Sequence, residues 1–159
     1  DFELELDFKI SKGANSGIKY FLDPELLKER GFAVGLEFQI LDDKNHPDAK
    51  KGKDGNRTIA SLYDLIAARN LSNLDRRVPF KGIGKWNRAH IIVKGSKVEH
   101  WLNGEKMLEF DRHSQVFSDL VKGSKYAKRQ NFGAWEKGAI LLQDHGDLVH
   151  FRSIKIKNL

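Results

Sequence analysis

The most regular alternation of apolar and polar residues runs through residues 86–110. Two short interruptions, Gly95-Ser96 and Asn103-Gly104, divide it into three runs. Asn-Gly is the pair that best tolerates the positive φ angles of a type I′ turn, so these interruptions indicate tight turns between antiparallel strands. We therefore expect a three-stranded meander around which the rest of the chain is organised.

The turns also predict which residues of the meander lie opposite one another. With two residues in each loop, Val93 faces Val98, Ile91 faces His100, and His100 faces Met107. His100 then projects among apolar residues, as a hydrogen-bonded core histidine does. The opposite face of the meander carries Arg88, His90, Glu99, Trp101 and Lys106.

Strand-like patterns also occupy residues 2–10, 15–21, 34–41, 58–67, 138–143 and 148–157, and short helical turns are expected at 24–30 and 114–127. Alternation in the first of these strands is strict, as in a half-buried antiparallel strand. In the last one, the apolar residues change parity at Arg152-Ser153, which predicts a β-bulge there. About nine short strands with little helix predict an all-β fold, a sandwich of two antiparallel sheets.

The composition adds limits to this picture. The 159 residues include three Pro and no low-complexity run, so we expect one domain over residues 1–159. The absence of Cys excludes disulfides, thiolate catalysis and a Cys-based zinc site, but it leaves the compartment open. No run of about 18 apolar residues exists, so no membrane span is expected. The chain starts within a strand pattern and without a signal peptide, which we interpret as a mature or trimmed form.

The formal net charge of +6 raises the question of a nucleic-acid partner. The densest basic cluster, residues 44–57, also contains acids and carries no nucleic-acid-binding motif. We interpret it as a solvated loop, with a phosphate-binding patch as the alternative, and we expect no nucleic-acid partner. Charge alone assigns no partner.

Three polar residues of the 34–41 strand and its end are candidates for chemistry. Glu37 and Gln39 are two positions apart, so their side chains emerge together on the face opposite the core, where they could hold sugar hydroxyls. Asp42 follows at the end of the strand and adds a second carboxylate, the minimum that acid/base cleavage of a glycosidic bond usually requires. The alternative is an ordinary solvated face.

Two aromatic rings of the meander form a second candidate group. Trp101 and His90 should be cross-strand neighbours on the polar face, where the indole offers a stacking surface for a sugar and the imidazole offers hydrogen bonds. The alternative is that the connection at 114–127 simply covers the indole. The sequence leaves both interpretations open.

The turn at residues 143–147 concentrates an amide, two carboxylates and an imidazole. Because His titrates near neutrality and Asp can orient it, His145 with Asp144 is an acid/base candidate, and a plain polar hairpin turn is the alternative. The sequence has no P-loop, nucleophile elbow, HExxH or EF-hand pattern. No cofactor is expected, and scattered His and carboxylates could bind a metal ion only if folding gathers them.

Several of these motifs together carry a resemblance that runs from residue 1 to the C-terminus. The motifs are Asn15-Ser16-Gly17, Glu37-Phe38-Gln39-Ile40-Leu41-Asp42, Trp86-Asn87-Arg88, Glu99-His100-Trp101-Leu102-Asn103-Gly104, Gln143-Asp144-His145-Gly146 and Phe151-Arg152-Ser153-Ile154-Lys155-Ile156. In this order they resemble the 3-keto-disaccharide hydrolase domain family. The chain differs from that family in lacking its usual opening strand and in having a longer loop at 44–57.

The resemblance implies a concanavalin A-like jelly roll with a sugar site on its concave face. It also implies glycoside substrates oxidised at the third carbon and an extracytoplasmic location in a bacterium. The residues expected to carry the activity are Glu37, His145 and Asp42 as catalytic groups and Gln39, Trp101, His90, Asp144, Arg152 and Tyr63 as substrate-binding groups. We expect Glu37, Gln39, Trp101 and His145 to share one surface, and Leu36, Phe38, Ile91 and Val93 to lie between the sheets.

Three functional hypotheses remain open on the sequence. The first is a glycoside-cleaving enzyme, by elimination next to the keto group or by the two-carboxylate route of ordinary glycosidases. The second is a lectin-like domain that binds carbohydrate without cleaving it. The third is a basic binder of acidic glycans or nucleic acid, which would show steep salt dependence. The oligomeric state is not addressed by any of these patterns.

Overall fold

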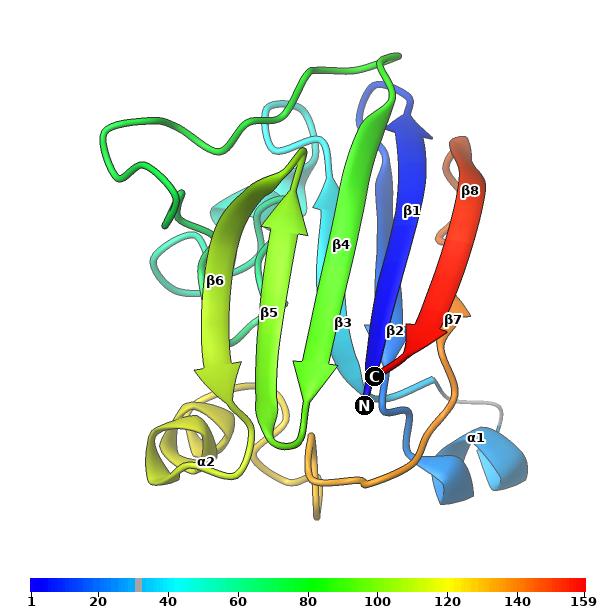
Figure 1. Ribbon diagram of the computed structural model, residues 1–159, viewed down its shortest axis with the longest axis vertical. Helices are drawn as coiled ribbons and strands as arrows, with labels where there is room; N and C mark the ends of the chain where they lie inside the picture. The colour runs from blue at the N-terminus through cyan, green and yellow to red at the C-terminus, as the bar shows by residue number, and fades with distance from the viewer. Residues whose placement is uncertain (31–32) are drawn as a thin grey trace.

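The computed structural model describes residues 1–30 and 33–159 and contains two antiparallel sheets. The larger sheet has the strand order β6-β5-β4-β1-β8 and the smaller one β3-β2-β7, and the smaller sheet lies behind the larger in Figure 1. The strands are β1 (Phe2–Ile10), β2 (Asn15–Tyr20), β3 (Leu36–Leu41), β4 (Asn87–Lys94), β5 (Lys97–Leu102), β6 (Glu105–Asp111), β7 (Leu141–Leu142) and β8 (Val149–Asn158). The predicted all-β jelly-roll sandwich is confirmed.

The core lies between the two sheets and follows from the alternation along the strands. Leu6 and Phe8 of the larger sheet and Phe38 of the smaller sheet are fully buried in one apolar cluster. The prediction that Leu36, Phe38, Ile91 and Val93 lie in this core is confirmed. Full burial of such a side chain contributes about 1.5–3 kcal/mol, so the period-2 pattern fixes which face of each strand turns inward.

The meander forms strands β4, β5 and β6 with the predicted turns. Asn103 and Gly104 have φ angles of 52° and 85°, as a type I′ turn requires, and Val93 lies opposite Val98. The expected pairing of His100 with Met107 is wrong. A register shift between His100 and Trp101 places His100 opposite Leu108, and both Met107 and Leu108 are buried.

His100 is the hydrogen-bonded core histidine that the pattern predicts. Its Nε2 lies 2.7 Å from the Tyr20 hydroxyl and its Nδ1 lies 3.2 Å from the Ala60 carbonyl oxygen. Since a carbonyl can only accept, Nδ1 donates to Ala60 and Nε2 accepts from Tyr20. Burial lowers the pKa of His100 to about 3, so the ring is neutral and ties the two sheets together.

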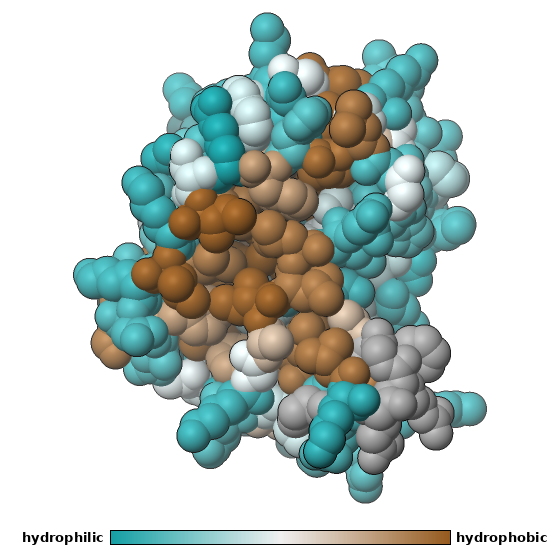
Figure 2. Space-filling model, turned by 90° about the vertical axis from the view of Figure 1, so that its right-hand side faces the viewer, coloured by the Kyte–Doolittle hydropathy of each residue, from teal (hydrophilic) through white to brown (hydrophobic). Residues whose placement is uncertain are grey.

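The C-terminal strand β8 contains the predicted bulge. Its pairing with β1 shifts between the partners of Glu5 and Asp7, where Ser153 has a φ of 52°. Strand β7 of the opposite sheet has two residues, so the inward side of β8 is left partly uncovered. Exposed apolar residues at and around β8 are Leu148, Ile154, Ile156 and Leu159. Figure 2, which views this side of the molecule, shows the resulting apolar surface.

Two sequence expectations about strands are corrected. Residues 58–67 form turns with isolated bridges of Leu62 to Phe38 and Ile66, because Ala60 and Asp64 adopt positive φ angles of 63° that bend the backbone out of a strand. The expected strand at 138–143 is reduced to β7. The helical turns are confirmed as α1 (Pro24–Arg30) and α2 (Gln115–Lys122), and a 3₁₀ helix, η1 (Pro47–Lys50), lies in the basic loop. Among the described residues, no helix has the length and apolar character needed to cross a membrane.

Candidate active site

Glu37 and Gln39 project from β3 on the outer face of the smaller sheet, the face turned away from the core. They alternate with Phe38, which packs inward. Strand β2 pairs with β3 so that Lys19 lies opposite Glu37 and Gly17 lies opposite Gln39. A Cβ atom at Gly17 would overlap the Glu37 carboxylate, so the glycine allows the Glu37 side chain to lie across β2.

This outer face is covered, so the alternative of an ordinary solvated surface is wrong for Glu37 and Gln39. Their exposed fractions are 5% and 1%. Loop residues run along the edge of β3, where Tyr63 N–H donates to the Glu37 carbonyl oxygen over 3.0 Å and Ala60 N–H donates to that of Gln39 over 2.8 Å. These bonds join the loop to the edge of β3, and the side chains of Glu37 and Gln39 are buried although strand alternation alone would leave them in water.

The Glu37 carboxylate lies among cationic side chains. Lys19 Nζ is 3.7 Å from Glu37 Oε2. Burial raises the pKa of Glu37 above its ordinary value, while the charges of Lys19, Lys125 and His145 act in the opposite direction. A buried carboxyl with a raised pKa is a stronger base when ionised than an exposed glutamate, as general-base catalysis requires.

Two amide oxygens next to this carboxylate have no partner. Gln39 Oε1 and Gln143 Oε1 are buried and accept no hydrogen bond within the part of the chain that the structure describes. The other end of the Gln39 amide is fixed, because its Nε2 donates to Asn15 Oδ1 over 3.3 Å. Since an unsatisfied buried acceptor costs about 1–3 kcal/mol, these oxygens are suited to accept hydrogen bonds from hydroxyl groups of a ligand.

The turn that carries His145 is tied to the start of β2. Ser16 Oγ donates to the Gln143 carbonyl oxygen over 2.7 Å, and Asn15 N–H donates to Asp147 Oδ2 over 2.9 Å. These bonds bring His145 near enough for its charge to affect Glu37. Asp144 and His145 are both exposed, and Asp144 Oδ1 accepts from Gly146 N–H, which is the role of a turn residue.

Hydrogen bonds also connect the basic loop at 44–57 with Tyr63 and Asp64. Arg57 donates to Asp64 Oδ1 over 2.6 Å and to Asp48 Oδ1 over 3.1 Å, and Tyr63 OH donates to Asp48 Oδ2 over 2.7 Å. Asp64 Oδ2 in turn accepts from Lys125 N–H over 3.0 Å. The loop is mostly exposed, as expected, but its buried Asp48 links it to Tyr63 and to the segment that carries Lys125.

Asp42, expected as a second catalytic carboxylate, is buried at the end of β3 and is held by neighbouring donors. Its Oδ2 accepts from Gly13 N–H and from Asn45 Nδ2, each over 2.7 Å. Hydrogen bonds from Gly13 and Asn45 hold the pKa of Asp42 below its ordinary value despite burial. The carboxylate therefore stabilises the loop that follows β3.

Trp101 lies on the opposite side of the molecule from Glu37, so the expected surface shared by Glu37, Gln39, Trp101 and His145 is wrong. His90 and Arg152, which were expected to bind substrate, lie on the Trp101 side. Trp101 alternates with His100, whose ring contacts Phe38 of the smaller sheet at a centroid distance of 4.9 Å. Trp101 therefore points away from the smaller sheet, whereas Glu37 points away from the larger one. The two sheets lie between them, because neighbouring residues on a strand face opposite ways.

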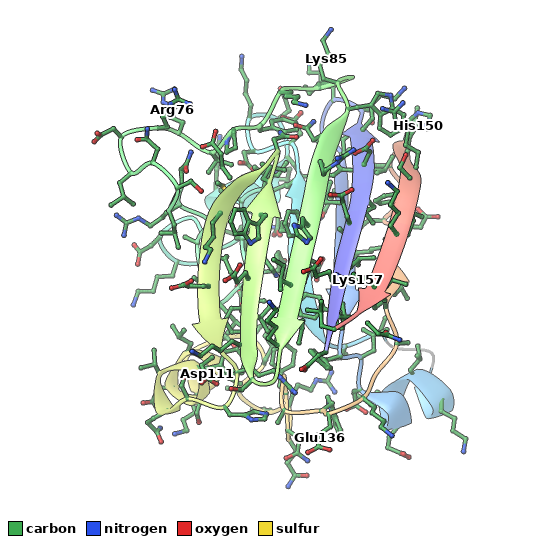
Figure 3. The ribbon with its side chains drawn as sticks, viewed as in Figure 1. Arg76, Lys85, Asp111, Glu136, His150 and Lys157 are labelled. Atoms are coloured by element: carbon green, nitrogen blue, oxygen red, sulfur yellow. The ribbon has the colours of Figure 1, made fainter. Side chains whose placement is uncertain are left out.

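The outer face of the larger sheet has its own polar contacts. Trp101 Nε1–H donates to Glu99 Oε2 over 2.7 Å, and the indole is not covered by α2 as the alternative had it. Arg152 stacks on Trp86 with its guanidinium carbon 3.9 Å from the ring centroid and contacts Asp7. Figure 3 looks onto this face and shows charged side chains along its strands, with His150 and Lys157 near the two ends of β8.

Sequence reasoning missed two lysines. Lys19 is signalled only by its place opposite Glu37, which requires knowing how β2 pairs with β3 across a 15-residue connection from 21 to 35. Lys125 lies after the end of α2, within the 114–127 stretch where helical turns are expected, and nothing in that pattern relates it to Glu37. Residues 1–30 and 33–159 contain no group of three or more His, Asp or Glu side chains arranged to hold a metal ion.

The fold and the site together define a β-sandwich domain with a buried carboxylate beside amide and cationic side chains. The chain belongs to the family described as the 3-keto-alpha-glucoside-1,2-lyase-like domain, whose model matches residues 1–157. The resemblance noted in the sequence is thereby confirmed.

Relatives of known name are consistent with this family. A protein of Bacteroides thetaiotaomicron named 3-keto-disaccharide hydrolase is 39% identical over 179 residues, and the match covers 100% of this chain and 59% of the relative. The chain therefore spans less than two thirds of that relative's length.

Two crystal structures of proteins from Parabacteroides distasonis, both named as candidate glycosyl hydrolases, have the same fold. The first is 28% identical with a TM-score of 0.83, covering 99% of this chain and 70% of its own. The second is 27% identical with a TM-score of 0.64, and the match covers 99% of this chain and 78% of the second protein.

Proposed function

We propose that the chain cleaves glycosides that carry a keto group at the third carbon, by elimination. The observation that carries the proposal is Glu37, a buried carboxylate with a raised pKa beside two unpartnered amide oxygens. The family description and the name of the Bacteroides relative support the substrate class.

A keto group at C3 acidifies the hydrogen on C2, and elimination uses this acidity. The Glu37 carboxylate takes the C2 proton, and the electrons of the C–H bond form an enolate and then a C1–C2 double bond. The C1–O bond breaks as this double bond forms, and its electron pair leaves with the glycosidic oxygen. Protonated His145 gives that oxygen a proton, so the products are an unsaturated keto sugar and an alcohol.

The two-carboxylate route is less well supported by the geometry. It requires a second carboxyl group at a set distance on the opposite side of the bond. Asp42 is held by Gly13 and Asn45, while Asp48 and Asp64 are bonded to Arg57. Glu37, by contrast, is buried with a raised pKa and lies 3.7 Å from Lys19 Nζ, and this single activated carboxylate favours elimination.

The test is incubation of the purified chain with a 3-keto disaccharide and with the unoxidised disaccharide. We expect cleavage of the first alone, with an unsaturated keto sugar detected by its absorbance and mass. Cleavage of both sugars without an unsaturated product would favour the ordinary glycosidase route. Binding without any product would favour a lectin-like domain. An extracytoplasmic location is part of the proposal and is checked by fractionating the source cells.

A further inference from the structure

A cavity of about 260 Å³ adjoins the Glu37 site and has a cationic lining. Lys19, Lys125 and Arg129 line it, together with the apolar side chains of Ala33, Val34 and Tyr126. Lys19 connects the cavity to the site, because its Nζ lies 3.7 Å from Glu37 Oε2 and donates to the Ala33 carbonyl oxygen over 3.1 Å.

Two of the three cations have no acidic partner. Neither Lys125 nor Arg129 forms an ion pair with any residue that the structure describes. The Lys125 ammonium instead lies 4.0 Å from the centroid of the Tyr63 ring, and burial lowers its pKa. Both side chains keep contact with solvent, so a ligand can reach them.

We propose that this cavity binds an oxyanion on the substrate, the carboxylate of a uronic acid or a sulfate ester, and so makes the enzyme selective for acidic glycosides. This inference rests on the proposed function for the position of the scissile bond at Glu37. Arg129 can hold either oxyanion through two parallel N–H donors, and Lys125 acts as a point charge.

The charge and size of the cavity favour an anionic substituent over a neutral sugar ring. Lys19 is paired with Glu37, whereas Lys125 and Arg129 have no ion-pair partner among the described residues. An anion can offset these two charges, and a neutral sugar cannot. The volume is below the roughly 300 Å³ at which ordinary ligand pockets begin, so the cavity suits a substituent. A bound anion also raises the pKa of the nearby Glu37, which strengthens it as a base at the moment of binding.

The first test measures binding and needs no turnover. Calorimetry with methyl glucoside, methyl glucuronide and methyl glucoside 6-sulfate compares a neutral, a carboxylate and a sulfate ligand. We expect at least one acidic ligand to bind about tenfold more tightly than the neutral one, with a preference that weakens as salt is added. The tighter acidic ligand identifies which oxyanion the cavity takes.

Variants test whether the preference for acidic ligands arises in this cavity. Arg129→Gln should bring the acidic-to-neutral affinity ratio close to one. Lys128→Gln is the matched control, because it removes a neighbouring exposed cation that does not line the cavity. Equal affinities for all three ligands in the wild type, or the same loss of preference in both variants, would overturn the proposal.

Turnover separates this inference from the proposed function. The ratio of kcat/KM for an acidic over a neutral 3-keto glycoside should exceed one and fall in Arg129→Gln. Cleavage with no acidic preference overturns the oxyanion site and leaves the function intact. Tight binding of the acidic ligand without cleavage of any keto glycoside supports the oxyanion site and overturns the proposed reaction.

Discussion

Lys19 and Glu37 face each other across the pairing of β2 with β3, with Lys19 Nζ 3.7 Å from Glu37 Oε2. Burial raises the pKa of Glu37, and the Lys19 charge acts against that rise. The protonation state of the candidate base is thus set by two opposing effects that can be changed separately.

Replacing Lys19 by Met should move the acid limb of the pH dependence of kcat/KM to higher pH, by about one unit or more. The reaction needs ionised Glu37, so activity falls as the pH drops through the pKa of Glu37. Without the Lys19 charge that pKa rises further. Lys94→Met, an exposed change on the larger sheet, is the control, and an unmoved acid limb in Lys19→Met would contradict the assignment of Glu37 as the base.

Glu37→Gln should lower turnover of a 3-keto glycoside by about a hundredfold or more, the usual loss on removal of a general base. The amide keeps the size of the side chain but cannot take the C2 proton. The comparison is Glu109→Gln, whose side chain on β6 is 61% exposed. Full activity in Glu37→Gln would mean that another group removes the proton.

The same Glu37→Gln variant should have a higher free energy of unfolding than the wild type near neutral pH. Because the pKa of Glu37 is raised in the folded state, folding is favoured below that pKa and loses stability as the pH rises through it. The amide does not pay this cost of burying a charge. Urea denaturation at neutral and mildly acidic pH measures the difference in free energy of unfolding between the variant and the wild type. A difference that grows as the pH falls would refute the prediction.

His145→Gln should slow cleavage in proportion to how poor the leaving group is. A general acid matters most when the departing oxygen is strongly basic, as in a disaccharide, and least for an activated aryl glycoside. We expect about a hundredfold loss on the 3-keto disaccharide and a much smaller loss on its nitrophenyl counterpart. Equal losses on both substrates would assign His145 to binding instead of proton donation.

Gly17→Ala should reduce kcat/KM by about tenfold or more, because the added methyl overlaps the Glu37 carboxylate and a displacement near 1 Å is enough to impair catalysis. Circular dichroism should show that the sheet is retained. Gly123→Ala is the matched control, since the added Cβ meets nothing closer than 3.6 Å. Wild-type activity in Gly17→Ala would show that the side chain of Glu37 can move without consequence.

Trp101→Phe should leave kcat/KM within about twofold of the wild type, since the indole lies on the far side of both sheets from Glu37. The ring packs with Glu99 and Lys106 and not with any residue of the candidate site. Measuring kinetics on the same 3-keto disaccharide checks this. A tenfold loss would mean that the substrate reaches the outer face of the larger sheet.

The local sequence determined much of the fold by itself. Period-2 alternation assigned the inward side of β1 and β3, and the positive φ that Asn-Gly tolerates set the turn between β5 and β6. The change of parity of the apolar residues along β8 predicted the bulge at Ser153. These features depend on neighbours within a few residues of each other, which is why the pattern of residues is sufficient to predict them.

The local sequence predicted only part of the candidate site. Strand parity predicted the direction of Glu37 and Gln39, and the concentration of polar side chains at 143–147 indicated His145 as a candidate. The sequence could not show that Trp101 and Glu37 point to opposite sides, because each is simply the polar neighbour of a core residue on its own strand. Which sheet a strand joins is decided by long-range pairing.

Tertiary structure alone decided the chemistry of the site. Burial in the folded chain raises the pKa of Glu37, and the pairing of β2 with β3 brings Lys19 to it. A hydrogen bond from the Lys125 backbone N–H to Asp64, 61 residues earlier in the chain, holds Lys125 near the site. Burial and charge proximity depend on distances through space, and no spacing along the chain encodes them for residues that far apart.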